Sequence, residues 1–110
     1  MEFESSTILF LYAAEDAPEL DEDSRREIRQ AHLDHQTELA RRGVVVIAGP
    51  FDQSSDERLA GMSVLSVEPA EALALYASDP AVKAGLLRCE AAVWWRFAGG
   101  AEFRNILDSE

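Results

Sequence analysis

Residues 7–12 read TILFLY, a run of β-branched, aliphatic and aromatic side chains that is typical of a β-strand. Side chains alternate between the two faces of a strand, so Ile8, Phe10 and Tyr12 lie on one face and the two leucines on the other. Both faces are therefore apolar. A strand with this pattern indicates a sheet that is covered on both sides, and this requirement decides the fold.

The remaining sequence predicts five further elements around this strand. In chain order they are a helix over 24–42, strands over 44–48 and 62–67, a helix over 69–77 and a strand over 86–97. The resulting order, βαββαβ, is typical of an α+β ferredoxin-like sandwich, in which two helices cover one face of an antiparallel sheet. Because the helices cover only one face, we expect a second copy of the chain to cover the other and form a homodimer.

Local signals define the ends and faces of the two helices. Ser24 and Glu27 have the spacing of a capping box, which predicts the start of the first helix, and Gly43 can take the left-handed position after its last turn. The second helix is interrupted by Asp79-Pro80. Its expected apolar face consists of Ala70, Leu73, Ala74 and Ala77.

The composition is that of one globular domain over 1–110, with a core over 7–97 and a tail over 98–110 that could form a short helix. Ten Lys and Arg against 21 Asp and Glu give a net charge of −11, which disfavours nucleic acid and anionic membrane surfaces as partners. The single cysteine, Cys89, excludes an internal disulfide, and the acidic N-terminus does not resemble a signal peptide. We therefore expect a cytoplasmic protein.

Both histidines of the chain lie in the first predicted helix, three residues apart. Their spacing places His32 and His35 on one helix face with Ile28 and Leu39, and so toward the core. A polar ring in that position needs a hydrogen-bond partner or lines a pocket. His32 is the candidate proton carrier, because an imidazole titrates near neutral pH and can act as a general base or acid.

Asp79 is the candidate partner that would fix the tautomer of His32. It is followed by Pro80, however, and an Asp-Pro pair at a helix start is commonly an N-cap. From spacing alone the capping role is favoured, although the two roles are compatible.

Two other interpretations concern the neighbours of His32. His35 could join it in binding a metal, but no third ligand is positioned in the sequence, so we expect no metal site and a hydrogen-bonded histidine instead. Arg25 and Arg29 precede His32 on the same side of the helix, where they could attract an anionic substrate or pair with surface carboxylates.

The order and spacing of several motifs resemble the YciI-like (YCII-related) family over about residues 7–97. The matching residues are Arg25 and Arg29 ahead of His32-Leu33, then Leu39, Gly43, Ala48-Gly49-Pro50, Gly61, Glu71-Ala72, Asp79-Pro80 and Ala84-Gly85. The resemblance implies a ferredoxin-like fold that dimerises into an α/β-barrel. It also implies an active site around the His32–Asp79 pair, with elimination or dehalogenation chemistry on small ring compounds as the reference reaction. With it, Asp79 is favoured as a site residue and capping becomes its second role.

The chain departs from the family pattern at His35, where an aromatic or apolar residue is common, and at Met62, where a small hydroxyl residue is frequent. The sequence thus predicts a cofactor-independent enzyme in which Asp79 orients His32, and His32 moves a proton on a small-molecule substrate held by Arg29 or His35. The alternatives are a non-catalytic dimeric module that binds a small ligand and a metal-dependent enzyme that uses both histidines.

Overall fold

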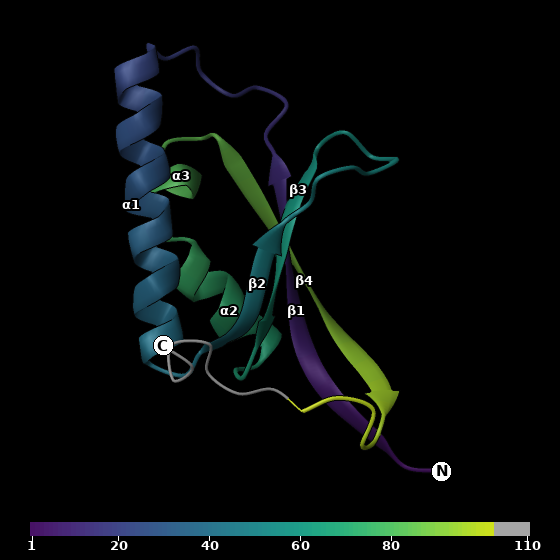
Figure 1. The fold of residues 1–110 in the computed structure, drawn as a ribbon. Helices are drawn as coiled ribbons and strands as arrows, with labels where there is room; N and C mark the ends of the chain where they lie inside the picture. The colour runs from purple at the N-terminus through teal and green to yellow at the C-terminus, as the bar shows by residue number, and fades with distance from the viewer. Residues whose placement is uncertain (103–110) are drawn as a thin grey trace.

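The computed structural model describes residues 1–102. Within them the elements are, in chain order, β1 (Phe3–Ala13), α1 (Glu22–Arg41), β2 (Val45–Pro50), β3 (Leu59–Leu65), α2 (Pro69–Tyr76), α3 (Pro80–Lys83) and β4 (Leu87–Phe97) (Figure 1). Most of the tail over 98–110, with the short helix considered for it, lies outside the described residues.

The four strands form one antiparallel sheet in the order β2-β3-β1-β4. Because β3 is antiparallel to both of its neighbours and lies between them, β1 and β2 are parallel and connected through α1, which is the split βαβ arrangement. The helices all lie on one side of the sheet (Figure 1). The fold is therefore α+β and of the ferredoxin-like type, as the order of predicted elements indicated.

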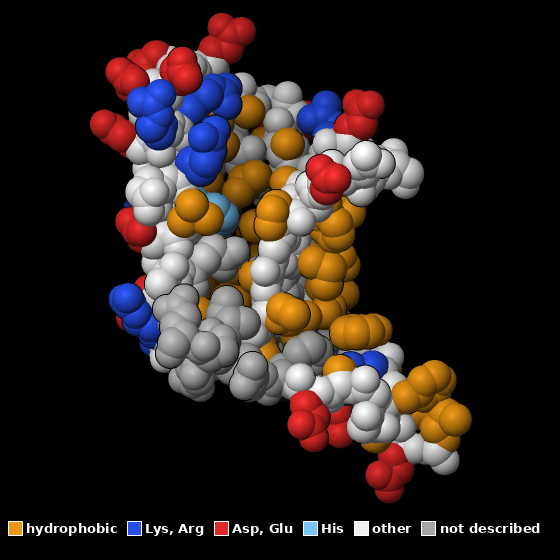
Figure 2. Space-filling view, in the orientation of Figure 1, with side chains coloured by type: hydrophobic (Ala, Val, Ile, Leu, Met, Phe, Trp, Pro, Cys, Tyr) orange, Lys and Arg blue, Asp and Glu red, His pale blue; other side chains and the backbone are white. Residues whose placement is uncertain are grey.

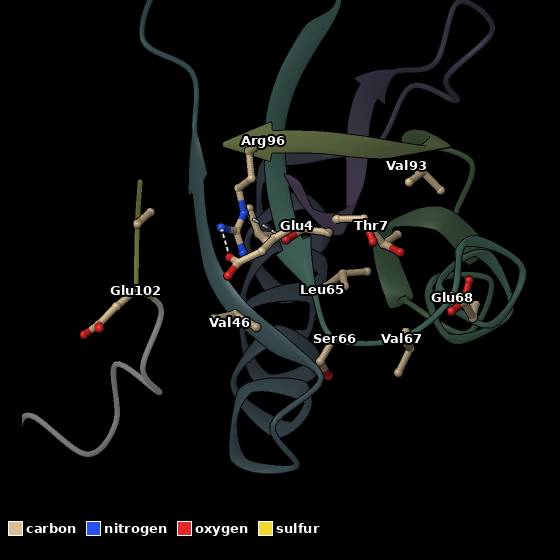
Figure 3. A pocket seen from close by; sticks show the side chains of 14 residues that line it. Glu4, Thr7, Val46, Leu65, Ser66, Val67, Glu68, Val93, Arg96 and Glu102 are labelled. Atoms are coloured by element: carbon tan, nitrogen blue, oxygen red, sulfur yellow. Dashed lines mark hydrogen bonds and ion pairs between the residues drawn. The ribbon is translucent and has the colours of Figure 1, made fainter. Parts of the chain in front are cut away.

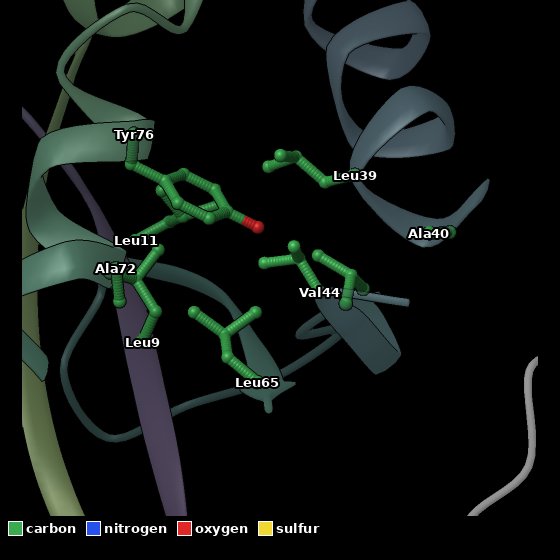
Figure 4. Close-up of a cluster of buried hydrophobic side chains, with 9 residues drawn as sticks. Leu9, Leu11, Leu39, Ala40, Val44, Leu65, Ala72 and Tyr76 are labelled. Carbon is green, nitrogen blue, oxygen red and sulfur yellow. The ribbon is translucent and has the colours of Figure 1, made fainter. Parts of the chain in front are cut away.

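The hydrophobic core fills the space between the inner face of the sheet and the helices (Figure 4). Its buried members are Leu9, Leu11, Leu39, Ala40, Val44, Val45, Leu65, Ala72 and Tyr76. They come from β1, α1, β2, β3, α2 and the turn after α1, so this one cluster fixes α1 and α2 against the sheet. Within residues 1–102, no helix combines the length and apolar character needed to cross a membrane.

The predicted apolar face of the second helix was wrong. The side of α2 that packs on the sheet carries Ala72 and Tyr76, which are fully buried, whereas Ala70, Leu73, Ala74 and Ala77 are exposed. Tyr76 carries more apolar surface than any residue of the predicted face, and burying that surface sets the rotation of this short helix. The tyrosine hydroxyl group points toward α1 (Figure 4).

The predicted capping box was also wrong, because α1 begins earlier than Ser24. Asp21 is the N-cap, and its side chain accepts a hydrogen bond from the backbone N–H of Ser24 at 2.7 Å. The end of the helix is as predicted: Arg42 is the C-cap, and Gly43 has a positive φ of 76°.

The outer face of the sheet, on the side away from the helices, is largely apolar. Strand alternation places the following apolar residues on it: Ile8, Phe10, Tyr12, Ile47, Met62, Val64, Ala92 and Trp94. The same alternation places Arg88 and Glu90 there, opposite Tyr12 and Phe10, and these two form an ion pair at 3.2 Å. Ile47 and Trp94 are 45% and 44% exposed in this single chain. Figure 2 shows hydrophobic side chains gathered along this side of the sheet.

Candidate functional site

Asp79 lies between α2 and α3 and is completely buried. One carboxylate oxygen, Oδ1, accepts hydrogen bonds from the backbone N–H groups of Ala81 at 2.8 Å and Val82 at 3.4 Å. Pro80 follows as the first residue of α3. Asp79 is thus the N-cap of α3, as its spacing from Pro80 predicted.

The other carboxylate oxygen of Asp79 contacts both histidines. Oδ2 lies 2.7 Å from Nδ1 of His32 and 3.1 Å from Nδ1 of His35. An ionised carboxylate can only accept hydrogen bonds, so each histidine donates from Nδ1. In its neutral form each ring therefore has its lone pair on Nε2, and this tautomer is the one that leaves Nε2 of His32 able to accept a proton.

The surroundings of Asp79 favour its ionised form. Burial acts to raise the pKa of this carboxyl group, but the hydrogen bond and charge of His32, the N–H of Ala81 and the charge of His35 outweigh burial. The net effect is a pKa below the ordinary value of 3.8. Asp79 is therefore a negative charge at neutral pH, fixed against the two rings.

His32 lines a cleft between α1 and the β2–β3 edge of the sheet. The cleft has a volume of about 670 Å³, and its lining consists of Leu11, Arg29, His32, Leu33, Gln36, Thr37, Ala48, Gly49, Pro50, Ala60, Gly61, Met62 and Leu87. Figure 2 shows a histidine side chain, in pale blue, on the α1 side of this hollow. Most of the lining is apolar, which is typical of a small-molecule site with a few polar groups.

The structure places the predicted site residues in two layers. Arg29 and His32 line the cleft, while His35 and Asp79 are not part of its lining. The His35 ring meets the ring of Tyr76 edge-on, with 5.8 Å between the centroids. Arg25, which precedes Arg29 by one turn, is exposed and does not line the cleft.

Three connected residues, Gln36 in the cleft lining and Tyr76 and Ser63 behind it, were not predicted as part of the site. The hydroxyl group of Tyr76 donates a hydrogen bond to Oε1 of Gln36, and Oγ of Ser63 lies 3.2 Å from the same hydroxyl oxygen. Burial, together with the charge of Asp79, raises the pKa of Tyr76 to about 12, so its phenol group remains protonated. The one signal in the sequence was the position of Gln36, which follows His32 by four residues on the same helix face.

Cys89 lies near the same cluster but has the character of an inert thiol. It is a free cysteine packed against the core. Burial and the charge of Asp79 raise its pKa to about 11, so the reactive thiolate form is scarce at neutral pH.

A second hollow lies beside the N-terminal part of β1 and the loop that follows β3, and it has a different lining (Figure 3). Its side chains are mainly hydroxyl, carboxylate and aliphatic groups, and Arg96 forms an ion pair with Glu4 at 2.6 Å. Among the described residues that line it there is no histidine. The part of the chain covered by the structure also contains no group of three or more His, Cys, Asp or Glu side chains arranged to hold a metal ion. The histidine cleft is therefore the candidate site.

Comparison with known proteins identifies a family and a similar fold. Residues 8–95 match the YCII-related domain. Among solved structures, the chain is similar to 5-chloro-2-hydroxyhydroquinone dehydrochlorinase (TftG) from Burkholderia phenoliruptrix AC1100 in complex with 2,5-dihydroxybenzoquinone. The sequence identity is 20% and the TM-score 0.53, over 86% of this chain and 95% of TftG. No curated protein matches the sequence. At this identity the likeness to TftG establishes a shared fold.

Proposed function

The chain belongs to the YCII-related domain family, and from this premise we propose that it is a small-molecule lyase in which His32 and Asp79 carry out acid/base chemistry. The observation that carries the proposal is the 2.7 Å contact between Nδ1 of His32, which lines an apolar cleft, and the buried carboxylate of Asp79 behind it. A histidine held in one tautomer by a carboxylate, with its second nitrogen available, is suited to accept a proton.

The proposed reaction is an elimination on a small ring compound. The substrate reacts as its keto tautomer, in which the ring carbon that carries the leaving group is sp3. Nε2 of His32 removes the proton of an enol hydroxyl group one double bond away from that carbon, and the O–H electron pair forms a C=O bond while the ring π bond shifts toward the sp3 carbon. The bond from this carbon to the leaving group breaks at the same time, and the leaving group departs as an anion with its electron pair. The charge of Asp79 stabilises the imidazolium that forms, and the proton passes from His32 to solvent.

The cleft supports a substrate of this kind. Its apolar lining suits a flat ring, and the guanidinium group of Arg29 can attract an anionic or electron-rich substituent. The dehydrochlorinase with a similar fold suggests halogenated hydroxyquinols as the first compounds to test. For His35, its contact with Asp79 supports a positioning role better than direct contact with the substrate.

The enzyme would act as a homodimer in this proposal. A second copy packed on the outer face of the sheet would cover apolar side chains that a single chain leaves partly exposed, such as Ile47 and Trp94. A monomer could hold the His32–Asp79 pair, because both residues come from the same chain.

The test is release of chloride from 5-chloro-2-hydroxyhydroquinone, followed by ion chromatography. We expect His32→Ala and Asp79→Asn to lower kcat by about 100-fold to 10,000-fold, the usual range for loss of general acid/base catalysis. Asp34→Asn is the matched control, because Asp34 is an exposed carboxylate of α1 bonded to Gln30, and its loss should leave the rate unchanged.

Three results would contradict the proposal. One is a rate that does not depend on His32. Another is a wild-type protein that binds 2,5-dihydroxybenzoquinone but turns over no substituted hydroxyquinol, which would assign the chain to the non-catalytic binding modules. The third is a rate that requires an added divalent metal, which would favour the metal-dependent alternative.

A further inference from the structure

We propose that Gln36 is the specificity-determining residue of the cleft: its amide, held from behind by Tyr76 and Ser63, donates hydrogen bonds from Nε2 to an oxygen atom of the ligand. This inference rests on the proposed function for the location of the ligand and adds the chemical feature by which the ligand is recognised. It therefore predicts a preference for rings that carry a phenolate, hydroxyl or carbonyl oxygen.

The buried hydrogen bonds that link Ser63, Tyr76 and Gln36 run in one direction. A tyrosine hydroxyl group has a single proton, and that of Tyr76 is donated to Oε1 of Gln36. The contact between Ser63 and Tyr76 must then run the other way, with Oγ of Ser63 donating to the tyrosine oxygen. Ser63 and Tyr76 are both completely buried, so water does not compete for these bonds.

These bonds fix the orientation of the Gln36 side-chain amide. With its Oε1 bound to Tyr76, Gln36 has its two N–H donors left on Nε2. Gln36 lines the cleft, and within residues 1–102 no group accepts a hydrogen bond from Nε2. A donor in a mostly apolar cleft gains most from an acceptor on the ligand.

Gln36 lies on the same side of α1 as the other residues of this helix that carry the proposed chemistry. Arg29, His32 and Gln36 are spaced three and four residues apart, so they form one stripe of the helix along the cleft. His32 lies between the two, about 6 Å along the helix axis from Gln36. A ring that presents a hydroxyl group to His32 can therefore place an oxygen against Gln36.

This placement has a chemical consequence for the proposed reaction. When His32 takes the proton of a ring hydroxyl group, negative charge develops on the conjugated ring and its oxygen atoms. The N–H groups of Gln36 would stabilise that charge where it forms. The donor is neutral, so it does not compete with His32 for the proton.

The experiment compares two ligands that differ in one group. 4-Nitrophenolate carries the oxygen, and 4-nitrotoluene has a methyl group in its place. Dissociation constants are measured by calorimetry or NMR titration, so the readout does not depend on turnover. The central variant is Gln36→Glu, which keeps an acceptor for Tyr76 but replaces the outward donor by a carboxylate oxygen. Gln30→Glu is the matched control, because it adds the same charge to the exposed side of the same helix.

We expect wild-type protein to prefer 4-nitrophenolate. Gln36→Glu should weaken binding of 4-nitrophenolate about tenfold or more, with little effect on 4-nitrotoluene, because a hydrogen bond to a charged oxygen is lost. Gln30→Glu should change neither value. Tyr76→Phe should reduce the preference less than Gln36→Glu, because the amide remains but is free to rotate. Gln36→Leu gives a second donor-free variant without added charge, and thermal unfolding checks that each variant is folded.

Several outcomes would overturn the inference: no preference in the wild type, equal losses for both ligands in Gln36→Glu, or a loss of the same size in Gln30→Glu. Failure of the proposed function is a separate result. If His32→Ala left turnover intact but the Gln36 variants lost the oxygen preference, recognition by Gln36 would hold and the acid/base assignment would not.

Discussion

At the scale of single residues, the two carboxylate oxygens of Asp79 have different tasks. Oδ1 caps α3 and Oδ2 accepts hydrogen bonds from both histidines. The sequence supported each task separately: the Asp-Pro pair predicted a cap, and the inward face of the helix predicted a partner for His32. Residue spacing in the sequence could not show that the Asp79 side chain has both roles. Its two carboxylate oxygens point in different directions, and the packing of α1 against α3 determines which groups lie next to Oδ2.

Asp79→Asn should separate these two tasks. The amide oxygen can still accept from Ala81, but its nitrogen would face the histidine donors, so we expect the free energy of unfolding to fall by about 1–3 kcal/mol at neutral pH. The pKa of Asp79 in the folded protein lies below its ordinary value of 3.8, so the stabilisation is present above about pH 4 and is lost as the pH falls through the folded value. Urea unfolding at a series of pH values should show the gap between wild type and variant narrowing in acid.

The control is Asp21→Asn. Asp21 is also an N-cap, but it is exposed and its side-chain oxygen accepts from the backbone of Ser24. Asparagine caps as well as aspartate. The hydrogen bonds from Ser24 also lower the pKa of Asp21, but this carboxylate is exposed and solvent screens its charge, so the substitution should have a much smaller pH-dependent effect than Asp79→Asn. A gap for Asp79→Asn that stayed constant down to strong acid would mean that the carboxylate charge contributes nothing to the fold.

At the scale of elements, the sequence predicted the type and order of the strands and main helices but not all of their ends and faces. β1 begins at Phe3 because residues 3–6 pair with 94–97 of β4, although three of these four residues are polar. β2 continues to Pro50, which an edge strand tolerates because one side of its backbone needs no partner. Both differences arise from pairing with a distant strand, which local propensity does not report.

The pairing of β2 with β3 next to the cleft depends on Gly61. A Cβ atom at this position would lie 2.9 Å from the backbone oxygen of Gly49, too close for either strand to keep its place. We expect Gly61→Ala to lower the free energy of unfolding by about 1–3 kcal/mol, the usual cost of overpacking. Because Gly61 lines the cleft, the same substitution should weaken ligand binding.

Gly49→Ala is the comparison for this prediction. Gly49 also lines the cleft, but a Cβ atom there would meet nothing within 4 Å. Urea unfolding and hydrogen exchange of the β3 amides should therefore distinguish the two variants. Equal losses of stability would show that glycine is required for backbone freedom in both strands and that the close approach of Gly61 to β2 is not the cause.

At the scale of the whole molecule, the site is assembled from segments that are distant in sequence. His32 and Asp79 are 47 residues apart, and the cleft walls come from α1, β2 and β3. The sequence predicted the pair through the helix face, the Asp-Pro break and a family resemblance. It could not predict the Ser63–Tyr76–Gln36 chain, because Tyr76 belongs to a helix whose inward face depends on packing against the sheet.

The outer face of the sheet leads to a prediction about assembly. If a second copy covers this face, a charge introduced at Trp94 would be buried without a partner between the two sheets. The desolvation free energy of that charge would destabilise the dimer enough for it to dissociate. We expect wild-type protein to sediment as a dimer at micromolar concentration and Trp94→Glu to sediment as a folded monomer.

Leu73→Glu is the control, since Leu73 is a similarly exposed apolar residue on α2 in the helix layer, and this variant should remain dimeric. A monomeric wild type, or a dimer that tolerates the charge at Trp94 as well as at Leu73, would mean that the apolar outer face has another partner. Because His32 and Asp79 lie within one chain, a monomeric Trp94→Glu variant that keeps its ligand affinity would further show that the cleft does not depend on the second copy.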